Sequence, residues 1–93
     1  MARKINPHTN EPYAKYNIRS FGLQARIARR TGLSAPIVSF IFNGVRRATI
    51  EQAAKLEEAF NHFGIRINRL DLMYDVRNGE SLIDYMDRRG GKE

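Results

Sequence analysis

One segment, residues 23–43, constrains the fold of this chain more than any other: LQARIARRTGLSAPIVSFIFN. Its first nine residues place apolar side chains on one face and arginines on the other, as an amphipathic helix does. A glycine turn follows. Ser34 is then a good N-cap for a second helix, whose first turn accommodates Pro36 because no amide donor is needed there. We therefore expect helices over 23–31 and 35–42, joined by a tight turn.

Charge is distributed unevenly along the chain. The 93 residues carry a formal net charge of +6. Residues 1–47 hold nine Lys or Arg and one acidic residue, whereas residues 48–93 hold seven Lys or Arg and nine acidic residues. A basic half joined to a mildly acidic half suggests that one part faces a polyanion and the other faces protein. Two helices joined by a glycine-containing turn, in a chain this basic, form the pattern of a DNA-binding helix-turn-helix.

The rest of the chain is also helix-prone, which predicts an all-α fold. Thr49 and Gln52 have the spacing of a capping box ahead of a strongly amphipathic helix. Asn68 and Ser81 can cap two further helices. A first helix is expected between residues 10 and 20. The predicted architecture is a small helical bundle that contains the helix-turn-helix and ends in a helical dimerisation segment.

Three parts are expected along the chain. Residues 1–12 would form a flexible basic arm, with Arg3 and Lys4 able to reach into a DNA groove. For this stretch we favour the simpler interpretation, a disordered terminus. Residues 13–64 would form the helix-turn-helix domain, and residues 65–93 a helical tail for dimerisation or partner binding. The apolar residues expected to make the dimer contact are Leu70, Met73, Tyr74, Leu82, Ile83, Tyr85 and Met86.

Other function classes find little support in the residues. The chain has no cysteine, and its two histidines, His8 and His62, are far apart, so we expect no metal site and no cofactor. No catalytic motif is present, and the acidic residues Asp71, Asp75, Glu80, Asp84 and Asp87 are spaced like the solvated faces of short helices. Neither a membrane span nor a secretory signal is evident, which predicts a cytoplasmic, nucleoid-associated protein of bacterial or phage origin.

A specific set of positions agrees with a known family without gaps: Gln24, Ile27-Ala28, Gly32-Leu33-Ser34, Val38, Ile41, Asn43-Gly44 and a capped helix that begins at Thr49. In these positions residues 20–63 closely resemble the Cro/CI-type, Xre-like helix-turn-helix of small phage and bacterial repressors. The headpiece of LacI-type repressors is similar in spacing and is a near relative. It includes a segment like IRINR at 65–69, but the sugar-binding domain of those proteins is not part of this sequence.

The resemblance implies which side chains meet DNA. Base edges would be contacted from the second helix by Ser34, Ala35, Pro36, Ser39 and Phe40. The phosphate backbone would be contacted by Gln24, Arg29, Arg30, Asn43, Arg46 and Arg47. The base-contacting set lacks the Gln, Arg, Asn or Tyr usual in these families, so we expect readout through thymine methyl groups and DNA shape. Ile37 and Phe40 could equally pack against protein.

The implied function is sequence-specific regulation of transcription, most simply repression. The expected partners are double-stranded DNA and a second copy of the chain, which together would read a palindromic operator. An antitoxin that uses its C-terminal tail to bind a toxin, and autoregulates its operon, is the alternative. Weak RNA binding by the basic face also remains open. We expect the double substitution Arg46→Ala with Arg47→Ala to lower affinity for any duplex.

Overall fold

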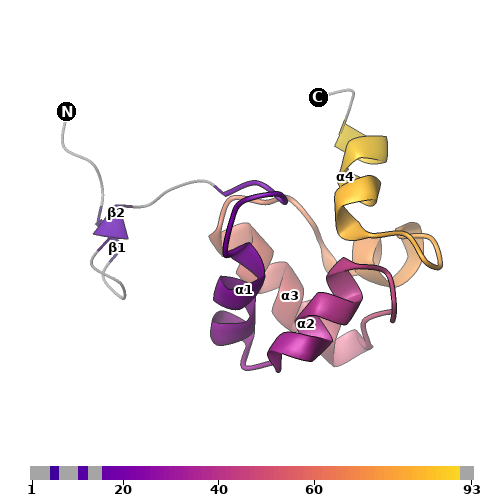
Figure 1. The fold of residues 1–93 in the computed structure, drawn as a ribbon, viewed down its shortest axis with the longest axis horizontal. Helices are drawn as coiled ribbons and strands as arrows, with labels where there is room; N and C mark the ends of the chain where they lie inside the picture. The colour runs from indigo at the N-terminus through magenta and orange to yellow at the C-terminus, as the bar shows by residue number, and fades with distance from the viewer. Residues whose placement is uncertain (1–4, 7–10, 13–15, 91–93) are drawn as a thin grey trace.

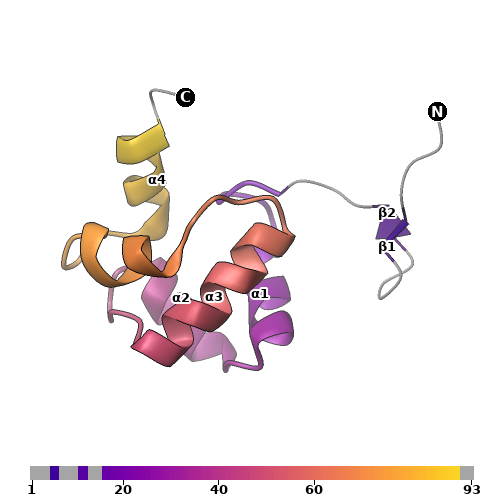
Figure 2. The same ribbon diagram turned by 180° about the vertical axis from the view of Figure 1, so that it is seen from behind.

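The computed structural model describes residues 5–6, 11–12 and 16–90, and its helices follow one another from residue 23 onward (Figure 1). The described helices are α1 (Leu23–Thr31), α2 (Ala35–Phe42), α3 (Ile50–His62), a π-helical turn η1 (Asp71–Asp75) and α4 (Leu82–Gly90). α1 packs against both α2 and α3, while α4 contacts α2 and η1 contacts α3. Viewed from the two sides, α2 lies in front of the molecule in Figure 1 and α3 lies in front in Figure 2.

A short strand pair near the N-terminus departs from the all-α expectation. β1 (Ile5–Asn6) pairs antiparallel with β2 (Glu11–Pro12), so that Ile5 lies opposite Pro12. Two residues on each side are too few to produce the alternation by which a strand is recognised in a sequence. The basic residues expected to reach a DNA groove, Arg3 and Lys4, lie outside the described residues.

The prediction of a helix between residues 10 and 20 is wrong over its described part, because residues 11–12 form β2 and residues 16–22 form turns and irregular structure. Asn17 Oδ1 accepts a hydrogen bond from the backbone N–H of Arg19 at 2.8 Å, and Ser20 Oγ accepts one from the N–H of Asn17 at 2.9 Å. Side chains of this kind bind nearby backbone donors and so compete with the helical hydrogen bonds. They favour a turn, and α1 begins only after it.

The expected helix caps are confirmed at α2, α3 and α4. Ser34 Oγ accepts from the N–H of Ile37 at 3.4 Å, and Ser81 Oγ accepts from that of Asp84 at 3.1 Å. At α3 the capping box is complete, since the side chain and backbone of Thr49 exchange hydrogen bonds of 3.2 and 3.1 Å with those of Gln52. These bonds satisfy amide groups that have no partner inside the helix, which fixes where each helix begins.

The segment that Asn68 caps is shorter and wider than a regular α-helix. Asn68 and Asp71 exchange two hydrogen bonds of 2.9 Å between side chain and backbone. The N–H of Val76 then donates to the carbonyl of Asp71 five residues earlier, at 2.9 Å, which is the bond of a π-helical turn. This turn ends at Val76, and a loop leads from there to α4.

A single hydrophobic core extends from α1 to α4. It contains Leu23, Ile27, Val38, Ile41, Phe42, Leu56 and Phe60 from the first three helices, and Ile65, Ile67, Leu72, Val76, Leu82 and Tyr85 from the segment that follows them. The two groups belong to one cluster of buried side chains. The described part of the C-terminal segment therefore completes the core on which α2 rests, rather than building a core of its own.

Candidate nucleic-acid interface

The second helix of the motif, α2, has one face turned into the core and one turned outward. Val38, Ile41 and Phe42 are buried. Ser34, Ala35 and Pro36 are exposed at the start of the helix, Ser39 is half-buried, and Phe40 keeps 44% of its surface exposed. All five residues expected to meet base edges are therefore accessible. An amphipathic helix placed in this way is what a major-groove reader requires.

Ile37 and Phe40, for which the sequence allows contact with either DNA or protein, differ in their surroundings. Ile37 is half-buried and packs against the hydrophobic core, as the packing interpretation expects. Phe40 remains on the outer face, and its carbonyl accepts the N–H of Val45 at 2.8 Å. Of these two side chains, Phe40 is therefore the one that is accessible to a thymine methyl group.

The start of α1 is open to an anion. Its N-cap is Gly22, at φ 77°, which offers no side-chain acceptor to the first amide groups, and no acidic residue lies in the first turn. Gln24 is exposed there. Because free amide groups at a helix start attract negative charge, a DNA phosphate can bind beside Gln24 as the resemblance implies.

The arginines around the motif fall into two groups. Arg29 and Arg46 are exposed, and neither forms an ion pair with another residue that the structure describes. Arg30 instead binds Glu58 of α3 through Nε and Nη2, at 3.1 and 2.8 Å. Arg47 also has internal partners, as described below. Arg29 and Arg46 are therefore the members of this set that are ready to meet phosphate.

Arg47 links the loop after α2 to the C-terminal segment. Its Nη1 donates to the carbonyl of Met73 at 2.6 Å, and its Nη2 donates to Oδ1 of Asn78 at 2.8 Å. These partners lie 26 and 31 residues away in the chain. No short sequence pattern could have indicated them. Asn43, another expected backbone contact, is exposed and donates from Nδ2 to Ser39 Oγ at 3.3 Å.

The two neighbouring arginines should therefore respond differently to substitution. We expect Arg46→Ala to lower affinity for every duplex and to reduce the slope of log K against log salt by about one, with unchanged thermal stability. Arg47→Ala should lower the free energy of unfolding by about 1 to 2 kcal/mol, because it removes two hydrogen bonds from a charged donor that link distant parts of the chain. Salt-titrated binding and urea unfolding of both variants measure the two effects. Equal salt slopes for Arg46→Ala and the wild type would remove Arg46 from the interface.

The apolar residues expected at a dimer contact are not equally accessible. Leu70 and Tyr74 of the η1 region are 58% and 70% exposed. Met73, Ile83 and Met86 are half-buried against the core. Leu82 and Tyr85 are 1% and 2% exposed, so they fill the core of their own chain and cannot contact a partner without unfolding it. A sequence pattern shows that a helix has an apolar face but not which element covers that face.

Comparison with known proteins agrees with this geometry. Residues 20–64 match the family described as Helix-turn-helix. Residues 20–64 therefore form a Cro/CI-type, Xre-like helix-turn-helix domain, and such a domain implies a DNA-binding transcriptional regulator. Neither the search of curated proteins nor that of solved structures found a significant match. Within the described part of the chain, no helix is long and apolar enough to span a bilayer.

Proposed function

We propose that the chain is a repressor that binds a palindromic operator as a homodimer, with α2 of each copy in the major groove. The observation that carries this proposal is the outward face of α2. It is accessible from Ser34 to Phe40 and backed by a fully buried face. Beside this face, the N-terminus of α1 and the exposed side chain of Arg46 would contact phosphate groups. Repression would follow from occupying the promoter.

The proposed readout combines small, apolar contacts with DNA shape. Ala35, Pro36 and Phe40 can contact thymine methyl groups, while the hydroxyl groups of Ser34 and Ser39 can donate to or accept from either kind of base. None of these side chains makes the bidentate contacts by which Arg selects guanine or Asn and Gln select adenine. The specificity ratio should therefore depend strongly on how easily the operator deforms.

In-vitro selection of duplexes from a random library tests the readout. We expect enrichment of a palindrome whose half-sites lie about 10 base pairs apart, with T-rich positions under α2. Affinities for the selected duplex and a scrambled duplex, measured over a salt series, then give the specificity ratio. Salt-sensitive binding without any enriched motif would contradict a sequence-specific repressor and indicate an architectural protein.

The proposed dimer surface is the exposed apolar pair Leu70 and Tyr74. Sedimentation at micromolar concentration should show a dimer for the wild type and a monomer for the double variant Leu70→Ser with Tyr74→Ser. The control is Phe21→Ser, which removes a fully exposed aromatic side chain outside this segment. A wild type that stays monomeric both with and without DNA would exclude the homodimer.

The same exposed pair also suits the second candidate, an antitoxin. Leu70 and Tyr74 lie outside the helix-turn-helix domain, so a protein partner could bind there while α2 remains on DNA. Co-purification with the product of a neighbouring gene, abolished by the double serine variant, would favour this function over the homodimer.

A further inference from the structure

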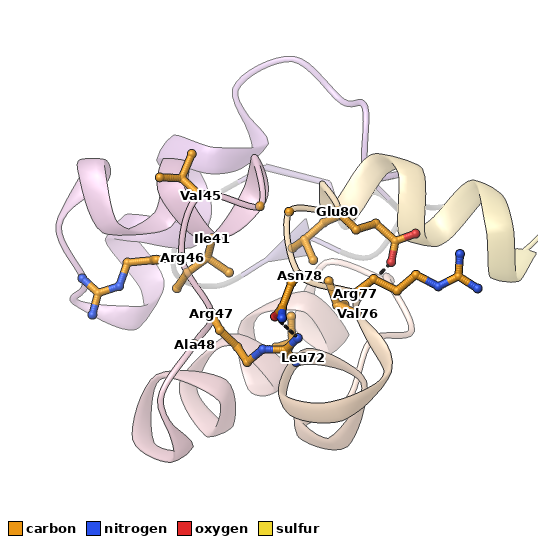
Figure 3. Close-up of a pocket in the computed structure, with 13 residues that line it drawn as sticks. Ile41, Val45, Arg46, Arg47, Ala48, Leu72, Val76, Arg77, Asn78 and Glu80 are labelled. Atoms are coloured by element: carbon orange, nitrogen blue, oxygen red, sulfur yellow. Dashed lines mark hydrogen bonds between the residues drawn. The ribbon is translucent and has the colours of Figure 1, made fainter.

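Two loops that are distant in sequence form the walls of one hollow at the end of α2. The first is residues 44–48, which follow α2, and the second is residues 76–80, between η1 and α4 (Figure 3). The hollow has a volume of about 250 Å³. The loops touch through their backbones: a Cβ atom placed on Gly44 would lie 2.6 Å from the carbonyl oxygen of Glu80.

A side-chain link holds the two loops in this arrangement. Arg47 of the first loop donates to Oδ1 of Asn78 in the second at 2.8 Å, and to the carbonyl of Met73 at 2.6 Å. Backbone contact and hydrogen bonds together hold the two loops next to each other at the end of α2. The second loop is therefore held close to the helix-turn-helix domain.

The second loop carries an exposed arginine, Arg77, that forms no ion pair with another described residue. Figure 3 shows Arg46 and Arg77 on opposite rims of the hollow, with their side chains pointing outward. The backbone N–H groups of Asn78 and Gly79 likewise donate to no described residue. The loop thus offers a guanidinium group and two amide donors, the groups that bind phosphate oxygen.

The one acidic residue that lines the hollow does not cancel this charge. Glu80 accepts from Nε and Nη2 of Arg88 at 2.9 and 2.8 Å. These bonds contribute most to lowering the pKa of Glu80 from 4.5 to about 2. The backbone N–H of Arg77, which donates to Glu80 Oε1 at 3.0 Å, and the charges of both arginines lower the pKa further, and together they outweigh the effect of burial. The carboxylate is therefore already balanced by a cation of α4, and the guanidinium group of Arg77 remains available.

We propose that Arg77 binds a backbone phosphate of the duplex, so that the DNA-binding surface extends beyond the helix-turn-helix domain into the loop of residues 76–80. The proposal rests on DNA binding by α2 and adds a contact on the far rim of the hollow. Because a phosphate carries no sequence information, this contact should strengthen binding to all duplexes alike.

The test compares three variants by salt-titrated affinity, on the selected operator and on a scrambled duplex. For Arg77→Ala we expect the slope of log K against log salt to fall by about one on both duplexes. The ratio of wild-type affinity to Arg77→Ala affinity should therefore fall about threefold between roughly 50 and 200 mM salt. Arg77→Lys should keep the wild-type slope, because it keeps the charge. Lys55→Ala, which removes an exposed cation of α3, should also keep it.

The outcomes separate this proposal from the function on which it rests. An Arg77→Ala slope equal to those of the wild type and Lys55→Ala overturns the phosphate contact while leaving DNA binding intact. A wild type that binds no duplex at any salt concentration overturns both. Thermal melts of the three variants, expected to coincide with that of the wild type, confirm that the fold is unchanged.

Discussion

Gly44→Ala should destabilise the fold by about 2 to 5 kcal/mol, one of the largest effects of any single methyl group in this chain. Gly44 has φ +77°, a conformation that costs an L-residue about 1 to 2 kcal/mol. The added Cβ would also lie 2.6 Å from the oxygen and 2.7 Å from the carbon of the Glu80 carbonyl. Backbone atoms cannot rotate away as a flexible side chain can, so the loop of residues 76–80 would have to move.

A matched control separates the two contributions at Gly44. Gly32, the C-cap of α1, has the same φ of +77°, but a Cβ there would meet nothing within 4 Å. Gly32→Ala should therefore lower the free energy of unfolding only by the cost of a positive φ, about 1 to 2 kcal/mol. Urea unfolding of both variants measures the difference. Equal losses at the two glycines would show that the backbone contact between residue 44 and residues 79–80 contributes nothing to stability.

Asp71→Ala should lower the free energy of unfolding by about 2 to 4 kcal/mol. Asp71 is 8% exposed and joins η1 to α4. Its Oδ1 accepts from the hydroxyl of Tyr85 at 2.8 Å, and its Oδ2 accepts from Nη1 of Arg89 and the N–H of Asn68, each at 2.9 Å. Alanine would leave the buried hydroxyl of Tyr85 without an acceptor and would remove the carboxylate partner of the partly buried Arg89, whose Nη2 still donates to the carbonyl of Arg66. Asp84→Ala, which removes an exposed carboxylate of α4, should cost less than about 1 kcal/mol.

The Asp71 cluster should also make stability depend on pH. Burial raises the pKa of Asp71, but the hydrogen bonds from Asn68 and Tyr85 and the charge of Arg89 outweigh it and bring the pKa below its usual 3.8. A carboxyl group whose pKa is lower in the folded state stabilises the fold above its unfolded pKa, and that contribution is lost as pH falls through the folded value. The stability difference between the wild type and Asp71→Asn should therefore narrow below about pH 4. A constant difference from pH 7 to pH 2 would contradict the role of the charge.

The helix boundaries that depend on residues close by in the sequence could be predicted best. Ser34, Pro36 and the Thr49–Gln52 box act within one helical turn, and α2 and α3 begin where these residues place them. The bounds of α1 also agree with the expected 23–31, because the glycine that ends it lies next to it in the chain. The exposure of the α2 face follows from the same helical periodicity.

Properties that depend on distant partners could not be predicted in this way. Asp71 and Glu80 were both expected on solvated faces, yet Tyr85 and Arg89 enclose the first and Arg88 binds the second. Arg46 and Arg47 are adjacent and identical in type, but of the two only the side chain of Arg47 has hydrogen-bond partners among the described residues. Local spacing contains no information on which cation is used inside the fold and which is left for DNA. Contacts across the folded chain decide this.

The shared core also limits how this DNA-reading unit can be reused. A chimaera that joined residues 1–64 to another protein would lose the contacts of α4 with α2 and of η1 with α3, and with them Ile67, Leu72 and Tyr85 of the shared core. Such a chimaera should be poorly folded, although it contains the whole helix-turn-helix domain. A transplant that ends after α4 keeps every buried side chain of the cluster and should retain the position of α2. Insertions and deletions that disturb the buried residues of η1 and α4 should therefore impair DNA binding as changes within the motif do.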